Sequence, residues 1–303
     1  MYLHNNKEAF KEILDIVANK NMIAPEIVEK DYYVTLILRL LSNKSDNIVF
    51  KGGTSLSKGF HVINRFSEDI DVTFDIHISE SKRKKLKYDI LKTISDELSL
   101  PISNWHLIRS GRDYNAYHFE YHSVFDFDHD KIPQYVKLET ALGSYSFPTE
   151  IVEIRNYIGD YLDETGKHEH SKKYLLDKFS MKLQSLERTY IDKIFALCDY
   201  YIERKSKRYS RHLYDIYMLT PLMNFDTNFK SLIKEVRLHR QNMSICPSAQ
   251  DGISINDIIK EFCQNDFYKE DYFSITNYFT NHTVEYDDVI KNILDLTNKN
   301  LFE

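Results

Sequence analysis

Two aspartates, two residues apart, are the groups in this chain best suited to chemistry. Asp69 and Asp71 lie in residues 69–74, whose alternating side chains predict a β-strand. On a strand this spacing puts both carboxylates on one face, while Ile70 and Val72 face the core. Carboxylates so placed repel each other unless a cation lies between them, and carboxylate and phosphate oxygens suit Mg²⁺. The pattern therefore predicts a divalent-metal site.

A double glycine precedes these aspartates. Gly52 and Gly53 follow residues 48–50, which are typical of the end of a buried strand, and they permit a tight turn and a close backbone approach to a ligand. Backbone N–H groups at the start of residues 54–60 would point at an anion, as they do at helix N-termini. A phosphate-binding turn beside a metal site is the equipment for phosphoryl or nucleotidyl transfer.

The alternative for Asp69 and Asp71 is a pair of turn or edge-strand carboxylates that interact with Lys51 or Arg65. Without the double glycine this alternative would be preferred. The turn upstream favours the metal site.

The order and wording of these motifs resemble a known family. Gly52-Gly53 followed by Asp69-Ile70-Asp71-Val72 is similar to the signature of the DNA polymerase beta-like nucleotidyltransferase superfamily. Within it, several segments resemble the AbiEii/AbiGii-type toxins of abortive-infection, type IV toxin–antitoxin systems: EKDYYV at 29–34, KGGTSLS at 51–57, RFSEDID at 65–71, ERT at 187–189 with Lys193, and RHLYDI at 211–216.

The resemblance implies a third carboxylate, contributed by a neighbouring strand, that completes a site for Mg²⁺ or Mn²⁺. Glu139, in the predicted strand 135–140, holds the matching position beside Asp69 and Asp71. Its alternative is a solvent-facing residue paired with Lys137. The competing carboxylates lie in a predicted loop: Asp126, Asp128 and Asp130.

The resemblance also implies a nucleotide site at the glycine turn. Gly52 and Gly53 would seat the phosphates, with the small hydroxyl residues Thr54, Ser55 and Ser67 beside them. The alternative for the three hydroxyl groups is to cap local turns.

Two further catalytic residues come from the downstream motifs. By resemblance, Lys193 faces the triphosphate, where a cation would neutralise charge as pyrophosphate leaves. Asp215 would orient Lys193 or a substrate group. The alternatives are a lysine that extends to solvent and a salt bridge between Asp215 and Arg211, one helical turn apart.

The function implied is a toxin that transfers a nucleotide from a nucleoside triphosphate to an acceptor, most plausibly the 3′ end of tRNA. A cognate antitoxin would be encoded nearby and, in a type IV system, need not bind the toxin. Two alternatives remain open: a small-molecule or protein acceptor, and a nucleotide-binding partner protein without turnover.

The overall charge does not indicate a nucleic-acid binder, since the net charge is −6. RNA contacts must then come from local basic runs. The run at residues 82–87 is typical of a solvated helix face. A second run lies between the predicted helices of Lys193 and Asp215, and it is the better candidate for RNA binding: Arg204, Lys205, Lys207, Arg208 and Arg211.

The pattern of elements predicts an α+β fold. Helical periodicity at residues 7–19, 25–42 and 79–98 surrounds predicted strands at 48–50, 69–74, 105–109, 116–122 and 135–141. After Pro148 and the polar stretch 163–173, the pattern is almost wholly helical to the end. We expect a nucleotidyltransferase-like mixed sheet flanked by helices over residues 1–160. A helical domain over residues 161–303 would contribute Lys193 and Asp215 to the cleft.

Composition indicates a folded protein, with 42% hydrophobic and 14% aromatic residues. The three cysteines form no CxxC pair, which favours reduced thiols over disulfides or zinc. No apolar run approaches the ~20 residues of a membrane span, and no signal-peptide pattern is present. We therefore expect a cytoplasmic protein with no membrane partner.

Overall fold

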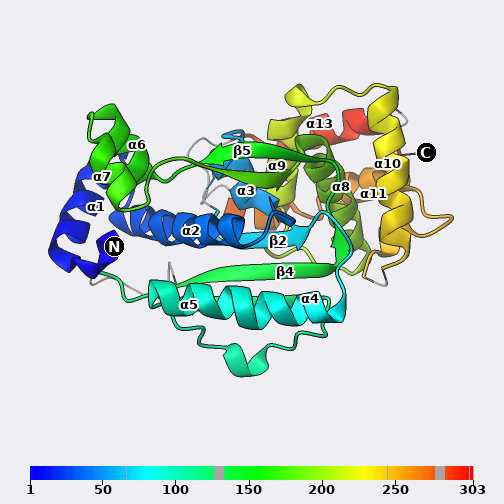
Figure 1. Ribbon diagram of the computed structural model, residues 1–303. Coiled ribbons are helices and arrows are strands. Elements are labelled where there is room, and N and C mark those ends of the chain that lie inside the picture. Colours follow the sequence, from blue (N-terminus) through cyan, green and yellow to red (C-terminus); the bar gives the residue numbers. More distant parts are fainter. Residues whose placement is uncertain (66, 126–132, 244, 277–283, 300, 303) are drawn as a thin grey trace. The chain divides into compact units, whose positions relative to one another are not determined.

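The computed structural model describes the chain except residues 66, 126–132, 244, 277–283, 300 and 303 (Figure 1). Its contacts divide into two compact units. Unit 1 comprises Met1–Phe60 and Ser67–Leu183, and unit 2 comprises His61–Phe66 and Gln184–Glu303. Both strands and helices are abundant, so the predicted α+β class is confirmed.

Unit 1 is built on a mixed six-stranded sheet with the order β3-β4-β2-β1-β6-β5. Strand β2 runs antiparallel to β1 and parallel to β4, so both of its edges are paired. The strands are β1 (Ile48–Lys51), β2 (Ile70–Phe74), β3 (Tyr114–Glu120), β4 (Tyr135–Tyr145), β5 (Thr149–Ile154) and β6 (Phe179–Gln184).

The helices of unit 1 begin where the sequence supplies caps. The Asn6 side chain accepts from the backbone N–H of Ala9, Pro25 is the first residue of α2, and Ser79 caps α4. The helices are α1 (Lys7–Asn21), α2 (Pro25–Lys44), α3 (Gly52–Lys58), α4 (Glu80–Lys85), a π-helical turn (Leu86–Leu91), α5 (Lys92–Leu98), α6 (Tyr157–Glu164) and α7 (His168–Lys173).

In its long segment from Gln184, the regular elements of unit 2 among the described residues are helices and the end of β6, whereas its short segment from His61 contains no helix. Serine and aspartate side chains cap its longer helices, namely Ser185, Asp226 and Ser254. The helices are α8 (Leu186–Ile202), α9 (Arg211–Leu219), α10 (Thr227–Gln241), α11 (Ile255–Gln264), α12 (Lys269–Asp271) and α13 (Tyr286–Thr297).

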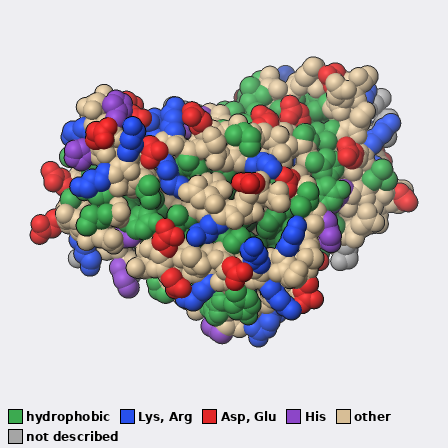
Figure 2. Space-filling model, in the orientation of Figure 1, with side chains coloured by type: hydrophobic (Ala, Val, Ile, Leu, Met, Phe, Trp, Pro, Cys, Tyr) green, Lys and Arg blue, Asp and Glu red, His purple; other side chains and the backbone are tan. Residues whose placement is uncertain are grey.

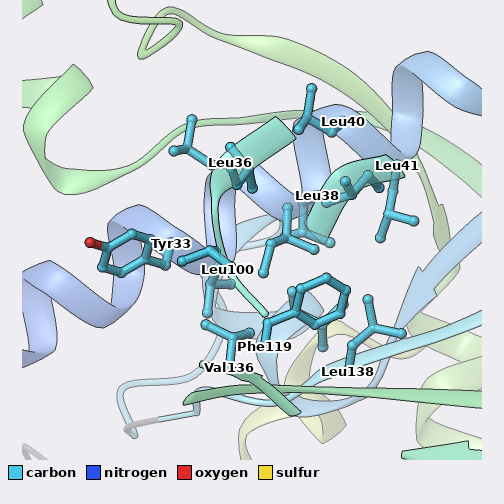
Figure 3. Close-up of a cluster of buried hydrophobic side chains, with 14 of the residues drawn as sticks. Tyr33, Leu36, Leu38, Leu40, Leu41, Leu100, Phe119, Val136 and Leu138 are labelled. Atoms are coloured by element: carbon cyan, nitrogen blue, oxygen red, sulfur yellow. The ribbon is translucent and has the colours of Figure 1, made fainter. Parts of the chain in front are cut away.

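One face of the sheet is apolar and packs against α2. Figure 3 shows Leu36, Leu38 and other α2 side chains beside Phe119 and Leu138 of the sheet. Phe119 is fully buried, as is Leu138. Because strand residues alternate, the residues between these apolar ones lie on the opposite face. That opposite face carries Asp71.

Three sequence expectations need correction or adjustment. Residues 105–109 do not form a strand, because Trp105–Leu107 is a short 3-10 helix. Strand β6 lies in the region after residue 173 that was predicted to be helical, and β5 is a strand that the sequence pattern did not predict. The unit boundary falls after Leu183 rather than after residue 160, because β6 pairs with β1 and so joins the sheet.

No helix among the described residues is long and apolar enough to cross a membrane.

A buried lysine of α2 binds the residues that lead into β4 and β2, the strands that carry the polar face. Lys30 is 1% exposed, and its Nζ donates to the carbonyls of Pro133 (2.8 Å) and Tyr135 (2.6 Å). The same ammonium lies 3.0 Å from a carboxylate oxygen of Glu68, the residue before Asp69. Burial lowers the pKa of Lys30, and the charge of Glu68 opposes that shift. Lys30 thereby ties the start of β4 to the residues that enter β2.

We expect Lys30→Met to lower the free energy of unfolding of unit 1 by about 1–3 kcal/mol, because two partly buried carbonyls lose their donor. Urea unfolding monitored by circular dichroism measures the change. Lys7→Met, which alters an exposed lysine on α1, is the matched control, with an expected effect within about 0.5 kcal/mol. Equal effects of the two substitutions would contradict the role assigned to Lys30.

Candidate active site

Asp71 and Glu139 lie opposite each other on the parallel strands β2 and β4. The strand register pairs Ile70 with Leu138 and Asp71 with Glu139. The apolar pair faces the α2 core, so the two carboxyl groups share the other face. Their side chains are joined by a hydrogen bond. The structure therefore places Glu139 directly beside Asp71.

Asp69 joins this pair through Lys137. The Lys137 ammonium lies 2.5 Å from Glu139 Oε1 and 3.3 Å from Asp69 Oδ2. The Tyr114 hydroxyl donates to Glu139 Oε1 at 2.6 Å. Glu139 is thus both paired with Lys137 and adjacent to Asp71, and the two interpretations weighed from the sequence coexist.

The pKa values show how crowded the negative charge is. Burial, followed by the charge of Glu139, raises the pKa of Asp71 to about 7. Burial would also raise the pKa of Glu139, but hydrogen bonds from Asp71, Lys137 and Tyr114 hold it below its ordinary value. Near neutral pH Asp71 is therefore only partly ionised, and Asp71 rather than Glu139 is the group that takes up a proton.

The carboxylate face of the sheet offers oxygen donors for a cation, but it already holds one positive charge. Within the described part of the chain, no group of three or more His, Cys, Asp or Glu side chains is arranged to hold a metal ion. The Lys137 ammonium lies between Asp69 and Glu139 and supplies positive charge there. The donors themselves, carboxylate oxygens from one sheet face, fit a hard cation such as Mg²⁺.

The competing carboxylates predicted from the sequence, Asp126, Asp128 and Asp130, lie outside the described residues.

Gly52 lets the turn pass directly over Asp71. Its φ is +80°, a left-handed conformation that favours glycine, and an added Cβ would lie 2.0 Å from Asp71 Oδ2. Lys51, the preceding residue, is the register partner of Asp71 on β1. The backbone at the start of α3 therefore lies directly against the Asp71 side chain, and Gly52 is required for steric reasons as well as for its φ.

The three predicted hydroxyl residues are largely occupied by local partners. The Ser55 hydroxyl is buried and donates to the carbonyl of Gly52 at 2.8 Å. Thr54 Oγ1 and Ser67 Oγ are hydrogen-bonded at 2.8 Å, with Thr54 buried and Ser67 partly exposed. This bond holds the residues before Asp69 against the first turn of α3. Of the three, Ser67 is the most accessible to a ligand.

In unit 2, Lys193 of α8 and Asp215 of α9 form a buried ion pair. Lys193 Nζ lies 2.7 Å from Asp215 Oδ2, and the carboxylate is fully buried. Arg65 donates two hydrogen bonds to the same carboxylate, Nε to Oδ1 and Nη2 to Oδ2, both 2.7 Å. Asp215 is thus bound to Lys193 rather than to Arg211, the partner proposed as its alternative.

This cluster holds more positive than negative charge. Burial would raise the pKa of Asp215, but Arg65 and Lys193 hold it well below its usual range. Burial lowers the pKa of Lys193, against the pull of Asp215, and Arg65 lowers it further. His212 lies 3.5 Å from Lys193 Nζ, and burial, Lys193 and Arg211 depress its pKa, so its imidazole is neutral. The remaining positive charge suits an anionic ligand such as a phosphate.

Arg65 is the site residue that sequence reasoning missed. The sequence indicates Arg65 only as a possible partner for Asp69 and Asp71. It lies in the segment His61–Phe66, which belongs to unit 2 although the residues on both sides belong to unit 1. Its place in the RFSEDID motif was the available signal, but only the fold reveals Asp215 as its partner.

The second basic run occupies the connection between α8 and α9 and the first residue of α9. Its side chains are exposed, namely Arg204, Lys205, Lys207, Arg208 and Arg211.

Comparison with known families decides the classification. The family described as "Nucleotidyl transferase AbiEii toxin, Type IV TA system" matches residues 36–292, which is most of the chain. The chain belongs to the AbiEii nucleotidyltransferase toxin family. This confirms the resemblance seen in the motifs. The AbiEii match includes the carboxylate strands, the glycine turn and both downstream motifs.

Two solved structures are similar to this AbiEii family member over nearly its whole length. JHP933 from Helicobacter pylori is 15% identical, with 92% of this chain and 93% of that chain covered and a TM-score of 0.48. The nucleotidyltransferase toxin MenT4 from Mycobacterium tuberculosis is also 15% identical, with 95% and 88% covered and a TM-score of 0.46. No curated protein matches the chain.

We expect Gly52→Ala to destabilise unit 1 by about 2–5 kcal/mol, since the left-handed conformation and the collision with Asp71 both contribute. Gly166→Ala is the matched control, because Gly166 has a φ of +72° but open space around its Cβ position. The control should cost about 1–2 kcal/mol. Thermal and urea unfolding measure both changes. Equal losses would show that contact with Asp71 is unimportant.

The raised pKa of Asp71 predicts a pH dependence of stability. A carboxyl group that binds its proton more tightly in the fold stabilises the fold below its unfolded pKa of 3.8, and this contribution is lost as the pH rises through about 7. Asp71→Asn cannot ionise. Its free energy of unfolding, relative to wild type, should therefore increase between pH 4 and pH 8 by at least about 1.4 kcal/mol, the equivalent of one pKa unit.

Urea unfolding in buffers with a chelator tests this pH dependence. Glu12→Gln, at an exposed position of α1, is the control and should show no such trend. A constant difference between Asp71→Asn and wild type across this pH range would rule out charge crowding at Asp71.

Proposed function

We propose that this AbiEii toxin transfers a nucleoside monophosphate from a nucleoside triphosphate to the 3′ end of tRNA. The observation that carries the proposal is the carboxylate group on one sheet face, with Asp71 opposite Glu139 under the glycine turn. A sheet face that concentrates negative charge at a cost in stability is typical of a functional site. The family supplies the reaction class, and the tRNA acceptor is part of the proposal.

Asp69, Asp71 and Glu139 would hold one or two Mg²⁺ or Mn²⁺ ions. Such ions supply activation of the acceptor hydroxyl and stabilisation of the leaving pyrophosphate. With an ion bound, the proton on Asp71 and the bridging position of Lys137 would no longer be needed to balance charge. Lys137 would then be free to contact a phosphate.

The nucleotide would lie against residues of both motifs. Gly52, Gly53 and Ser67 would seat the phosphates, and Thr54 and Ser55 would support the turn through their local hydrogen bonds. Lys193 would neutralise the triphosphate, while Asp215 would hold the Lys193 ammonium in place. The acceptor hydroxyl attacks the α-phosphorus in line, the bond to the pyrophosphate oxygen breaks, and the hydroxyl proton passes to water.

The surface gives no general preference for RNA. Figure 2 shows Lys and Arg side chains interspersed with Asp and Glu over the visible face, in keeping with the net charge of −6. An RNA acceptor therefore requires a local basic surface, for which the run from Arg204 to Arg211 is the candidate. A cognate antitoxin encoded nearby would counter the toxin, and direct binding between the two is not required.

The test incubates purified protein with Mg²⁺, total tRNA and each of the four labelled nucleoside triphosphates in turn. Label should enter tRNA with at least one triphosphate. Asp71→Ala and Lys193→Met should each lower the rate by more than about 100-fold, as loss of electrostatic groups at the reacting phosphate does. Lys260→Met, an exposed lysine of α11, is the matched control and should retain the wild-type rate.

Other outcomes would replace the proposal. Label in a protein or a small molecule, but none in tRNA, would identify another acceptor. Growth inhibition by Asp71→Asn equal to that of wild type would favour a nucleotide-binding protein that acts without turnover.

A further inference from the structure

The connection between α8 and α9 concentrates positive charge on an otherwise acidic protein. Residues 203–210, here called the α8–α9 loop, contain four cationic side chains and one acidic one, Glu203, and Arg211 follows at the start of α9. We propose that this loop, together with Tyr200, binds the single-stranded 3′ end of an RNA. The inference rests on the proposed function in that the RNA would be the acceptor of the transferred nucleotide.

The backbone of the loop is fixed by buried groups. Asp271, 6% exposed, accepts from the backbone N–H of Arg208 (2.7 Å) and of Ser210 (3.0 Å). The Ser210 hydroxyl is also 2.7 Å from that of Thr276. At the other end, the N–H of Lys205 donates to the carbonyl of Tyr200 at 2.8 Å. The loop is therefore held in place while its charged side chains remain at the surface.

Two arginines of the loop adopt a conformation that ordinarily favours glycine. Arg204 has a φ of 59° and Arg208 a φ of 72°. A left-handed residue with a side chain costs about 1–2 kcal/mol, and glycine or asparagine would relieve that cost. Retention of arginine at both turns is explained if the guanidinium groups have a role. Such strain is found at ligand-binding sites more than elsewhere.

The cations of the loop differ in whether they have a partner among the described residues. Arg204 lies over the ring of Tyr201, and Lys205 pairs with Glu203. Lys207 and Arg208 are exposed, and no ion pair involving either side chain is found among the described residues. Phosphate oxygens would supply the missing negative charge, since Arg and Lys position nucleic acids by contacting phosphates.

Two tyrosine rings are stacked beside these cations, and the His212 ring lies next to the pair. The centroids of Tyr200 and Tyr209 are 3.5 Å apart at an interplanar angle of 20°. His212 lies to one side of the pair with its ring nearly parallel to both, 5.9 Å from Tyr200 and 6.4 Å from Tyr209. Both tyrosines are partly exposed. Aromatic rings beside basic residues bind the unstacked bases of single strands. An acidic peptide would pair with the cations but would not require the rings.

His212 links the tyrosine pair to the proposed nucleotide site of the same unit. His212 Nδ1 lies 3.5 Å from the ammonium of Lys193, the cation assigned to the triphosphate. A strand whose last bases stack on Tyr209 and Tyr200 would therefore have its terminus near Lys193. This is the arrangement that a 3′-end acceptor requires.

The basic run on α4 provides a comparison within the same molecule. It has four consecutive cations, but Arg83 pairs with Asp113 and Lys84 with Glu80. The backbone of the α4 run is helical, whereas that of the α8–α9 loop is not. The stacked rings of Tyr200 and Tyr209 lie beside the loop, in unit 2. Charge alone would make the two runs equivalent as RNA ligands, so they form a matched pair for an experiment.

The experiment measures binding of fluorescently labelled tRNA to the full chain by anisotropy, without nucleoside triphosphate. The double variant Lys207→Glu/Arg208→Glu should weaken binding at least tenfold. Loss of two phosphate contacts should also reduce the slope of log K against log salt by about 1.4. Lys84→Glu/Lys85→Glu should change the affinity less than twofold. Circular dichroism and thermal unfolding establish that all variants are folded.

A second arm tests stacking on the single-stranded end. Tyr209→Leu should weaken binding of intact tRNA about tenfold, and Tyr209→Phe should restore it, because the ring and not the hydroxyl stacks. With tRNA lacking its single-stranded 3′ end, wild type and Tyr209→Leu should bind equally. Equal losses in the two double variants, or wild-type affinity unaffected by removal of the 3′ end, would overturn the inference.

These results are distinguishable from a failure of the proposed function. Binding that follows the expected pattern without nucleotide transfer would leave the RNA surface standing and refute tRNA as acceptor. Transfer to tRNA that is unchanged in Lys207→Glu/Arg208→Glu and in Tyr209→Leu would support tRNA as the acceptor and refute the α8–α9 loop as its binding surface.

Discussion

Unit 1 depends on the containment of negative charge on one face of its sheet. Asp71 and Glu139 are opposite each other in the parallel register of β2 and β4, a position in which two carboxylates repel. Partial protonation of Asp71, the Lys137 ammonium and the Tyr114 hydroxyl offset that repulsion. Alternation in the same strands buries Ile70 and Leu138 against α2. The hydrophobic core thus imposes the register, and the register forces the carboxyl groups together.

In unit 2 the excess charge is positive rather than negative. There a single buried carboxylate, Asp215, is surrounded by Arg65 and Lys193, and the neutral His212 lies alongside. Breaking such a pair is costly, since a buried charge would be left without a partner. The arrangement fixes the position of the Lys193 ammonium while leaving net positive charge in the cluster. One unit therefore concentrates groups suited to cations and the other concentrates groups suited to phosphates.

Both clusters are extended by residues that never need to touch a substrate. Lys30 joins α2 to Glu68 and to the carbonyls at the start of β4. A helix far upstream in the sequence therefore holds the residues that lead into both carboxylate strands. Asp271 does the same for the α8–α9 loop by binding its backbone. Such supporting groups hold functional side chains within the narrow geometry that chemistry requires.

The sequence by itself determined the α+β class, the carboxylate strand, the glycine turn and the family, because each depends on local spacing and residue type. It also indicated Lys193 and Asp215, although their mutual contact was only one of two options. The tertiary structure alone decided that Arg65 binds Asp215, that Lys30 is buried beneath the site, and that β6 joins the sheet. Those contacts link residues distant in the chain, and local periodicity contains no information about which distant partner a charged side chain will meet once both are removed from water.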